Sequence, residues 1–255
     1  MNGVNTMLRI EHLSYSYRKD VPCLKDISFS LKNGRIGVLL GKNGSGKSTL
    51  RKCILGFNQG YEGKAFYQDN DLSERKWKEK AKKIAYLPQK VPEFRLTVHE
   101  TLSLGLLPYQ TLFNKVNARE RIDEVVSLLS LEEFLPKDFT SLSEGEKQKV
   151  RIGKALIQGA NLLVLDEPTS SLDIENQKRI LTLRDTLAKE KGLSILLSLH
   201  DINLALKYGD DFFLLSQGER IYQGEKDGLT LSLLEKAFHT ERKLHSDGNE
   251  KYITY

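Results

Sequence analysis

A glycine-rich segment at residues 41–49 holds the residue types that bind phosphate groups: Gly41, Lys42, Asn43, Gly44, Ser45, Gly46, Lys47, Ser48 and Thr49. Glycines let backbone N–H groups turn inward around phosphate oxygens, and a helix that starts there adds a partial positive charge. Lys47 is placed to reach the β and γ phosphates of a nucleotide, and the Ser48 hydroxyl suits Mg²⁺. The segment therefore predicts a phosphate-binding loop for a nucleotide and its Mg²⁺.

Two carboxylates follow the apolar run Leu162–Leu165, which has the length and composition of a buried strand. Asp166 stands at the carboxyl end of this strand, where open parallel sheets bind ligands, and we expect it to hold Mg²⁺ through water. Glu167 is placed to accept a proton from the water that attacks the γ phosphate. An isolated Asp-Glu pair at this place would more often cap a helix, but the phosphate loop favours the catalytic interpretation.

Two further polar residues also follow strand-like runs. His200 comes after Ser194–Leu199 and is expected at the same sheet edge as Asp166, where its imidazole can bond the γ phosphate. Without the neighbouring motifs, a histidine satisfied at a strand end is an equally good interpretation. Gln89 follows the run Ile84–Leu87 and is expected to contact the γ phosphate or its Mg²⁺.

The segment at residues 141–148 has two compatible interpretations. Ser143 and Glu146 have the spacing of a capping box that opens a helix running to about Gln158. The same helix N-terminus suits an anion. If that anion is the γ phosphate of an ATP bound to another subunit, a loop of Ser143, Gly145 and Glu146 makes hydrolysis depend on dimerisation.

The apolar pattern indicates the elements that position these residues. Two alternating runs predict partly exposed antiparallel strands, at Leu8–Ile10 and Ile27–Leu31. The continuous run Ile36–Leu40 predicts a strand buried on both faces, as parallel strands are. A helix from Ser48 to Leu55 then ends at Gly56, so the phosphate loop lies between a strand and a helix.

The middle of the chain is predicted to be mostly helical, with capping signals at Thr97–Glu100 and at Asn117. Strand and helix then alternate: a strand at Leu162–Leu165, a helix from Ile174 to Lys191, a strand at Ser194–Leu199, a hairpin over 212–222 and a last helix at Leu231–Phe238. This order predicts an α/β fold, a P-loop NTPase core of mainly parallel sheet with an N-terminal antiparallel β part and an inserted α-helical subdomain. We expect one domain over 1–255, with its nucleotide-binding core at 1–89 and 160–255 and the helical subdomain at 90–159.

Composition favours an ordinary globular protein. The 255 residues are 39% hydrophobic and 29% charged, and no apolar run nears the roughly 18 residues that cross a bilayer. A net charge of +5 suits nucleic acid or an anionic membrane, but the scattered basic residues favour a solvated surface. Residues 1–9 lack a secretory pattern, and Cys23 and Cys53 lack metal or disulfide spacing, so we expect a protein with free thiols that stays in the cytoplasm.

Taken in order, these motifs resemble the ATP-binding cassette (ABC) family over essentially the whole chain. The resemblance implies ATP and Mg²⁺ as cofactors, and Tyr17 as the aromatic residue that stacks on adenine, with Tyr15 as the alternative. It also implies a homodimer formed on ATP binding, with Ser171 and Asp173 in the loop that contacts the second subunit.

One departure from the family concerns the signature loop. The usual sequence is Leu-Ser-Gly-Gly-Gln, and here it is Leu142-Ser143-Glu144-Gly145-Glu146. Ser143 and Gly145, which face phosphate in the family, are kept. We expect activity, but two extra carboxylates near a γ phosphate are expected to weaken ATP-driven dimerisation.

Within the family, the chain is most similar to ATPase subunits that energise import of iron-siderophore, haem and vitamin B12 complexes. The similarity lies in residues 87–89, 97–100, 106–109, 172–174 and 199–205. It implies an ATPase coupled to transport, peripheral at the cytoplasmic face of the cell membrane, with separate permease chains and a substrate-binding protein as partners. No nucleic acid is expected.

Three alternatives stay open at this point. One is a zinc or manganese importer ATPase, or another transporter class with the same ATPase unit. Another is a soluble ABC ATPase that acts on nucleic acid or ribosomes, although such proteins usually carry two cassettes or a long coiled coil. A third, a P-loop kinase, gives the Ser143 loop and His200 no role.

Overall fold

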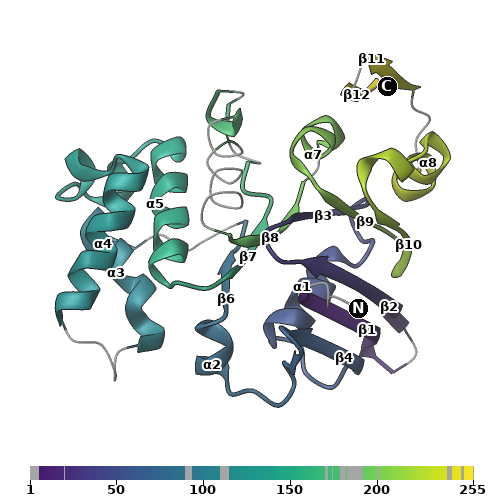
Figure 1. Ribbon diagram of the computed structural model, residues 1–255, viewed down its shortest axis with the longest axis horizontal. Helices are drawn as coiled ribbons and strands as arrows, with labels where there is room; N and C mark the ends of the chain where they lie inside the picture. The colour runs from purple at the N-terminus through teal and green to yellow at the C-terminus, as the bar shows by residue number, and fades with distance from the viewer. Residues whose placement is uncertain are drawn as a thin grey trace. The chain divides into compact units, whose positions relative to one another are not determined.

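The computed structural model describes residues 6–19, 21–89, 94–109, 115–169, 172–173, 175–178, 182, 192–199, 201–239, 243–247 and 250–254 (Figure 1). The chain forms two compact units. The first unit comprises residues 1–75 and 183–255, and the second comprises residues 76–182. The helical subdomain predicted over 90–159 lies within the second unit.

An antiparallel sheet opens the first unit, in the strand order β2-β1-β4-β5. Its strands are β1 (Thr6–Arg18), β2 (Val21–Lys32), β4 (Glu62–Tyr67) and β5 (Asn70–Asp71). Ile10 of β1 lies opposite Phe29 of β2 and Ala65 of β4, and alternate residues of β2 are buried over 27–31. The predicted antiparallel pair is confirmed.

Parallel strands form a second sheet in this unit, which also contains the separate antiparallel pair β11 (Lys243–Asp247) and β12 (Glu250–Thr254). β3 (Ile36–Leu40) pairs in parallel with β8 (Ser194–Ser198) and β9 (Asp211–Ser216), and β10 (Glu219–Gly224) completes a hairpin with β9. All residues of β3 are buried, as its continuous apolar sequence predicts, and all residues of β8 are buried too. The remaining elements are α1 (Lys47–Leu55), α7 (Ile202–Tyr208), the 3₁₀ helix η4 (Lys226–Gly228) and α8 (Leu231–Phe238).

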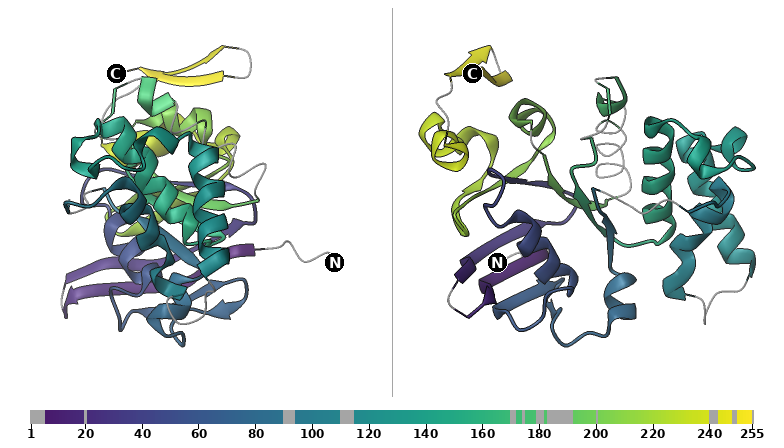
Figure 2. Two further views of the ribbon diagram at one scale, coloured as in Figure 1. Left: turned by 90° about the vertical axis from the view of Figure 1, so that its left-hand side faces the viewer. Right: turned by 180° about the vertical axis from the view of Figure 1, so that it is seen from behind.

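In the second unit, β6 (Ile84–Leu87) pairs in parallel with β7 (Leu162–Asp166). The helices are α2 (Trp77–Ala81), α3 (Val98–Ser103), α4 (Lys115–Leu129) and α5 (Glu144–Ile157), with 3₁₀ turns η1 (Leu104–Tyr109), η2 (Glu132–Phe134) and η3 (Phe139–Ser141). Figures 1 and 2 show α3, α4 and α5 side by side. A Cβ on Gly153 of α5 would lie 2.9 Å from Leu102 and 3.0 Å from Leu129, so the absence of a side chain allows this close packing.

The predicted α/β fold class is confirmed, because both units contain parallel strands and helices, the first carries the antiparallel part and the second carries the helical subdomain. Several boundaries differ from the predicted ones: β1 and β2 are longer, α1 begins one residue earlier, and α4 begins at Lys115 and not at Asn117. Lys and Val both continue a helix without loss of a hydrogen bond, so the backbone starts about half a turn earlier. The predicted helix from Ile174 to Lys191 lies mostly outside the described residues. Among those described, no helix has the length and apolar character that a bilayer crossing requires.

Candidate functional site

The phosphate loop joins the end of β3 to the start of α1, as predicted. Gly46 precedes α1 with φ at 105°, a conformation that side-chain-bearing residues rarely adopt. A Cβ there would also lie 2.7 Å from the Leu24 side chain. Both constraints explain why glycine stands at this position.

The N-terminus of α1 has no side-chain cap and no acidic residue in its first turn. Its first backbone N–H groups have no partner within the helix, and the helix dipole makes this end positive. The Lys47 ammonium is buried and donates hydrogen bonds to the carbonyl oxygens of Gly41, at 2.5 Å, and Lys42, at 3.1 Å. A cation and backbone donors therefore meet in one loop, which is the arrangement that binds an anion such as a phosphate.

Ser48 is exposed at the same helix end. It accepts a hydrogen bond at 3.0 Å from Arg51, whose guanidinium also donates to Ser198 of β8 at 2.9 Å. Arg51 is only 2% exposed, so this contact ties the first turn of α1 to the end of β8. The Thr49 hydroxyl contacts the Cys23 thiol at 3.2 Å.

Tyr17 lies at the edge of a surface hollow of about 510 Å³. Its ring is 56% exposed and packs edge-on against Tyr15, with 5.0 Å between the ring centroids. Gly44 of the phosphate loop and Gly218 of the β9–β10 turn line the same hollow. The structure thus brings Tyr17 and the phosphate loop together around a space of the size that small-molecule ligands occupy.

In the second unit, Gln89 and Glu167 meet at the carboxyl ends of β6 and β7. The Gln89 Nε2 donates a hydrogen bond to the Glu167 Oε2 at 2.6 Å. Both residues and Asp166 line a cavity of about 20 Å³, which is enough for a single water molecule. Glu167 has φ at 48°, a strained value for a residue other than glycine and one often found at functional sites.

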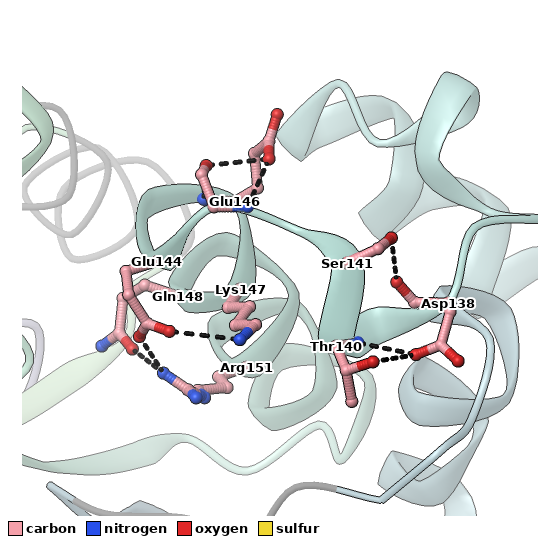
Figure 3. A network of polar contacts seen from close by, with 9 residues as sticks. Asp138, Thr140, Ser141, Glu144, Glu146, Lys147, Gln148 and Arg151 are labelled. Carbon is pink, nitrogen blue, oxygen red and sulfur yellow. Dashed lines mark hydrogen bonds and ion pairs between the residues drawn. The ribbon is translucent and has the colours of Figure 1, made fainter.

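The predicted capping box at the start of α5 is present. The Ser143 hydroxyl and backbone N–H both donate to the Glu146 carboxylate at 2.8 Å, and the Glu146 N–H points back to the Ser143 oxygen at 3.4 Å. A Cβ on Gly145 would come within 2.8 Å of the Asn176 side chain, which would have to move to make room for it. Figure 3 shows the network around this helix end.

The two carboxylates that replace family residues in this loop are both bonded within the chain. Glu144 forms ion pairs with Lys147 at 3.2 Å and Arg151 at 3.4 Å (Figure 3). Hydrogen bonds from Ser143 lower the pKa of Glu146, which keeps it charged. Sequence reasoning missed the pairing of Glu144, although its spacing of three residues to Lys147 is a helical ion-pair signal.

Three predicted site residues remain, and the structure describes one of them, Asp173. Asp173 accepts hydrogen bonds from the Asn176 N–H at 2.8 Å and side chain at 3.1 Å, so it caps the helical turn at residues 175–178. Ser171 and His200 lie outside the described residues.

Residues 24–170 match the model of a protein family described as ABC transporter. The matched region contains the phosphate loop, Gln89, the Ser143 loop and both carboxylates. The chain belongs to the ABC transporter family. It is an ATP-binding subunit, and such subunits are ATPases coupled to transport.

Similar proteins support the family assignment, and their similarity covers most of the ABC subunit's length. An iron(3+)-hydroxamate import ATP-binding protein of Bacillus subtilis is 34% identical over 252 residues, 97% of this chain and 91% of the relative. A vitamin B12 import ATP-binding protein of Vibrio atlanticus is 33% identical, over 98% of this chain and all of the relative. A solved structure of a putative metal-chelate type ABC transporter in an inward-facing conformation matches with a TM-score of 0.83 and 26% identity, over 98% of this chain and 96% of that one.

Each of the two units of the ABC subunit carries a predicted Mg²⁺ ligand of a type that fits this ion. The Ser48 hydroxyl and the Asp166 carboxylate are hard oxygen ligands, which this ion prefers. In the described part of the chain, no group of three or more His, Cys, Asp or Glu residues forms a metal site on its own. Such a set suits an ion that takes its other ligands from water and nucleotide phosphates.

Proposed function

We propose that the subunit hydrolyses ATP with Glu167 as the general base. The observation that carries this is the cavity for one water beside the Glu167 carboxylate, which Gln89 and Asp166 also line. A carboxylate at hydrogen-bond distance from a trapped water can accept its proton as the water attacks the γ phosphate. Gln89 orients the carboxylate, and His200 is assigned to the γ phosphate on the family resemblance alone.

The nucleotide is held by residues of the first unit. Tyr17 stacks on adenine, and the loop residues 43–49 hold the phosphates, with Lys47 at the β and γ groups. Ser48, Asp166 and Gln89 would hold Mg²⁺, which when bound neutralises charge on the phosphates. These roles are tested by nucleotide binding to variants at each position.

Hydrolysis requires a second copy of the chain. Ser143 lies exposed at the N-terminus of α5, where its hydroxyl and the helix dipole suit a phosphate. We assign that phosphate to an ATP on the partner subunit, contacted by Ser143, Gly145 and Glu146, with Ser171 and Asp173 at the dimer contact. Sedimentation of the chain with and without ATP tests this.

The cargo is a chelated metal, of the iron-siderophore, haem or cobalamin type. The cargoes of the two similar import proteins, iron(3+)-hydroxamate and vitamin B12, support this class. A zinc or manganese cargo is the alternative. ATP-driven uptake of ferric hydroxamate, cyanocobalamin and Zn²⁺ by the subunit with its own permease distinguishes these cargoes.

The surface that meets the permease is the apolar one at residues 94–107. Phe94 is 64% exposed, Leu107 48% and Leu104 37%, which together form more apolar surface than a solvated segment requires. The segment follows Gln89 in sequence, so contact of Gln89 with a γ phosphate can move it. We therefore place the subunit at the cytoplasmic face of the membrane, bound to permease chains that receive cargo from a substrate-binding protein.

A further inference from the structure

Helix α5, which begins at the signature loop, forms a hydrogen bond to the turn that follows β7. Gln148 of α5 is 7% exposed, and its Nε2 donates a hydrogen bond to the carbonyl oxygen of Pro168 at 2.8 Å. Pro168 is the residue directly after Glu167. One buried amide therefore fixes the backbone next to the proposed general base.

The orientation of this amide follows from its second contact. The Gln148 Oε1 accepts a hydrogen bond from the Arg151 guanidinium at 3.4 Å. Because a guanidinium only donates, the amide oxygen must face Arg151 and the nitrogen must face Pro168. Arg151 also pairs with Glu144 at 3.4 Å, so the group is linked back to the signature loop (Figure 3).

The turn needs such support because Glu167 has φ at 48°. A residue other than glycine adopts this conformation at an energetic cost, and the conformation persists only where the surroundings hold it. Further along the turn, Gln177 donates to the carbonyl oxygens of Thr169 at 3.2 Å and Leu172 at 3.0 Å. Gln148 and Gln177 therefore donate hydrogen bonds to three carbonyl oxygens of the turn. The carbonyl bonded to Gln148 is the one nearest the proposed base.

We infer that Gln148 is a positioning residue, which keeps the Glu167 carboxylate aimed at its water and ties that position to the helix bearing Ser143. Gln148 and Ser143 are five positions apart on one helix, about 7.5 Å along its axis. A phosphate that docks at Ser143 and shifts α5 moves the Pro168 carbonyl with it. This inference rests on the proposed role of Glu167 as the base.

The test replaces the donor with a side chain of similar shape. Gln148→Met should lower the turnover number about tenfold while the affinity for a fluorescent ATP analogue stays within about twofold, since a lost buried hydrogen bond has roughly this effect. Gln148→Asn keeps an amide, but its side chain is one methylene shorter than the contact with Pro168 requires. It should change turnover and ATP affinity as Gln148→Met does. Gln177→Met is the matched control, because its contacts lie further from Glu167, and it should change turnover less.

A double-mutant cycle separates positioning from general damage to the fold. In a Glu167→Gln background, Gln148→Met should lower the residual turnover no further, because there is no base left to position. Wild-type turnover in both Gln148 variants, or an equal loss with and without Glu167, would overturn the inference. If Glu167→Gln alone keeps wild-type turnover, the proposed base is wrong instead.

Discussion

The amide of Gln89 donates a 2.6 Å hydrogen bond to the Glu167 carboxylate, although the two residues are far apart in sequence. Parallel pairing of β6 with β7 brings them to one edge. Glu167→Gln removes the proton acceptor but leaves the phosphate loop intact. We expect unchanged ATP binding and a loss of turnover of at least about a hundredfold in a phosphate-release assay. Glu133→Gln, at an exposed glutamate, is the control, and similar turnover in both variants would contradict the assignment.

Lys47→Ala should weaken ATP binding, which Glu167→Gln leaves unchanged. It removes the cation that now bonds to the carbonyls of Gly41 and Lys42 and that is assigned to the β and γ phosphates. We expect at least about a tenfold weaker ATP affinity by equilibrium binding of a fluorescent analogue. Lys52→Ala, an exposed lysine on the same helix, should bind ATP like the wild type. Equal affinities for all three proteins would exclude the role of Lys47.

Dimerisation is tested in a chain that cannot hydrolyse its ATP. Glu167→Gln with ATP should sediment as a dimer, and addition of Ser143→Arg should return it to a monomer, because the larger side chain fills the phosphate contact. Ser127→Arg, at an exposed serine on α4, should leave the dimer in place. A persistent dimer in the Ser143 variant would mean that this loop does not close the ATP site.

Three capping carboxylates make the stability of the second unit depend on pH. Hydrogen bonds from Thr97 lower the pKa of Glu100, those from Thr140 lower that of Asp138, and those from Ser143 lower that of Glu146. A folded-state pKa below the unfolded value stabilises the fold above the unfolded value, near pH 4, and this contribution disappears as the pH falls through the folded value.

Nearby cations contribute in the same direction: His99 beside Glu100, Arg95 beside Asp138, and Lys137 and Lys149 beside Glu146. The Glu100→Gln, Glu146→Gln double variant should unfold at a lower temperature than the wild type at pH 7. The difference should shrink as the pH falls below about 4, because the carboxylates become protonated first in the unfolded chain and then in the folded one. Thermal unfolding followed by circular dichroism measures both, and a difference that is constant with pH would contradict the prediction.

Permease docking is tested at the exposed apolar side chains. Phe94→Glu and Leu107→Glu should leave the ATPase activity of the isolated subunit within about twofold, since neither residue lines the site. Both should abolish copurification with the permease and uptake of the metal chelate. Phe57→Glu changes an aromatic residue that is 53% exposed in the first unit and should copurify normally. Normal uptake in the Phe94 and Leu107 variants would place docking elsewhere.

Local sequence patterns were sufficient to predict the structure where a few neighbouring residues determine it. The capping box of Ser143 and Glu146 needs only residues that are three positions apart, and it is present. Helix α8 has the predicted bounds because Thr230 caps it and its apolar residues share a face. The strand that delivers Asp166 was predictable because its run of four apolar residues has no helical periodicity.

Contacts between distant residues were not predictable in this way. The Asn203 side chain donates a hydrogen bond to the Ile253 carbonyl oxygen and accepts one from the Ile253 N–H. This pairing depends on where β12 meets α7. Likewise, the link from Gln148 to the Pro168 carbonyl joins a helix to the turn after a strand, and neither segment has a pattern that indicates the other. The strained φ of Glu167 is also a result of the assembled fold, because its sequence neighbours do not require it.

The uncapped start of α1 makes the nucleotide a structural component as well as a substrate. A helix whose first N–H groups lack a side-chain acceptor is completed when phosphate oxygens accept from them. A ligand bound only by the native state stabilises it by about 2.7 kcal/mol at a hundred times its dissociation constant. That is about a hundredfold fewer unfolded molecules for a protease to cleave. Nucleotide that occupies this loop should therefore protect the subunit from proteolysis, in addition to serving as its substrate.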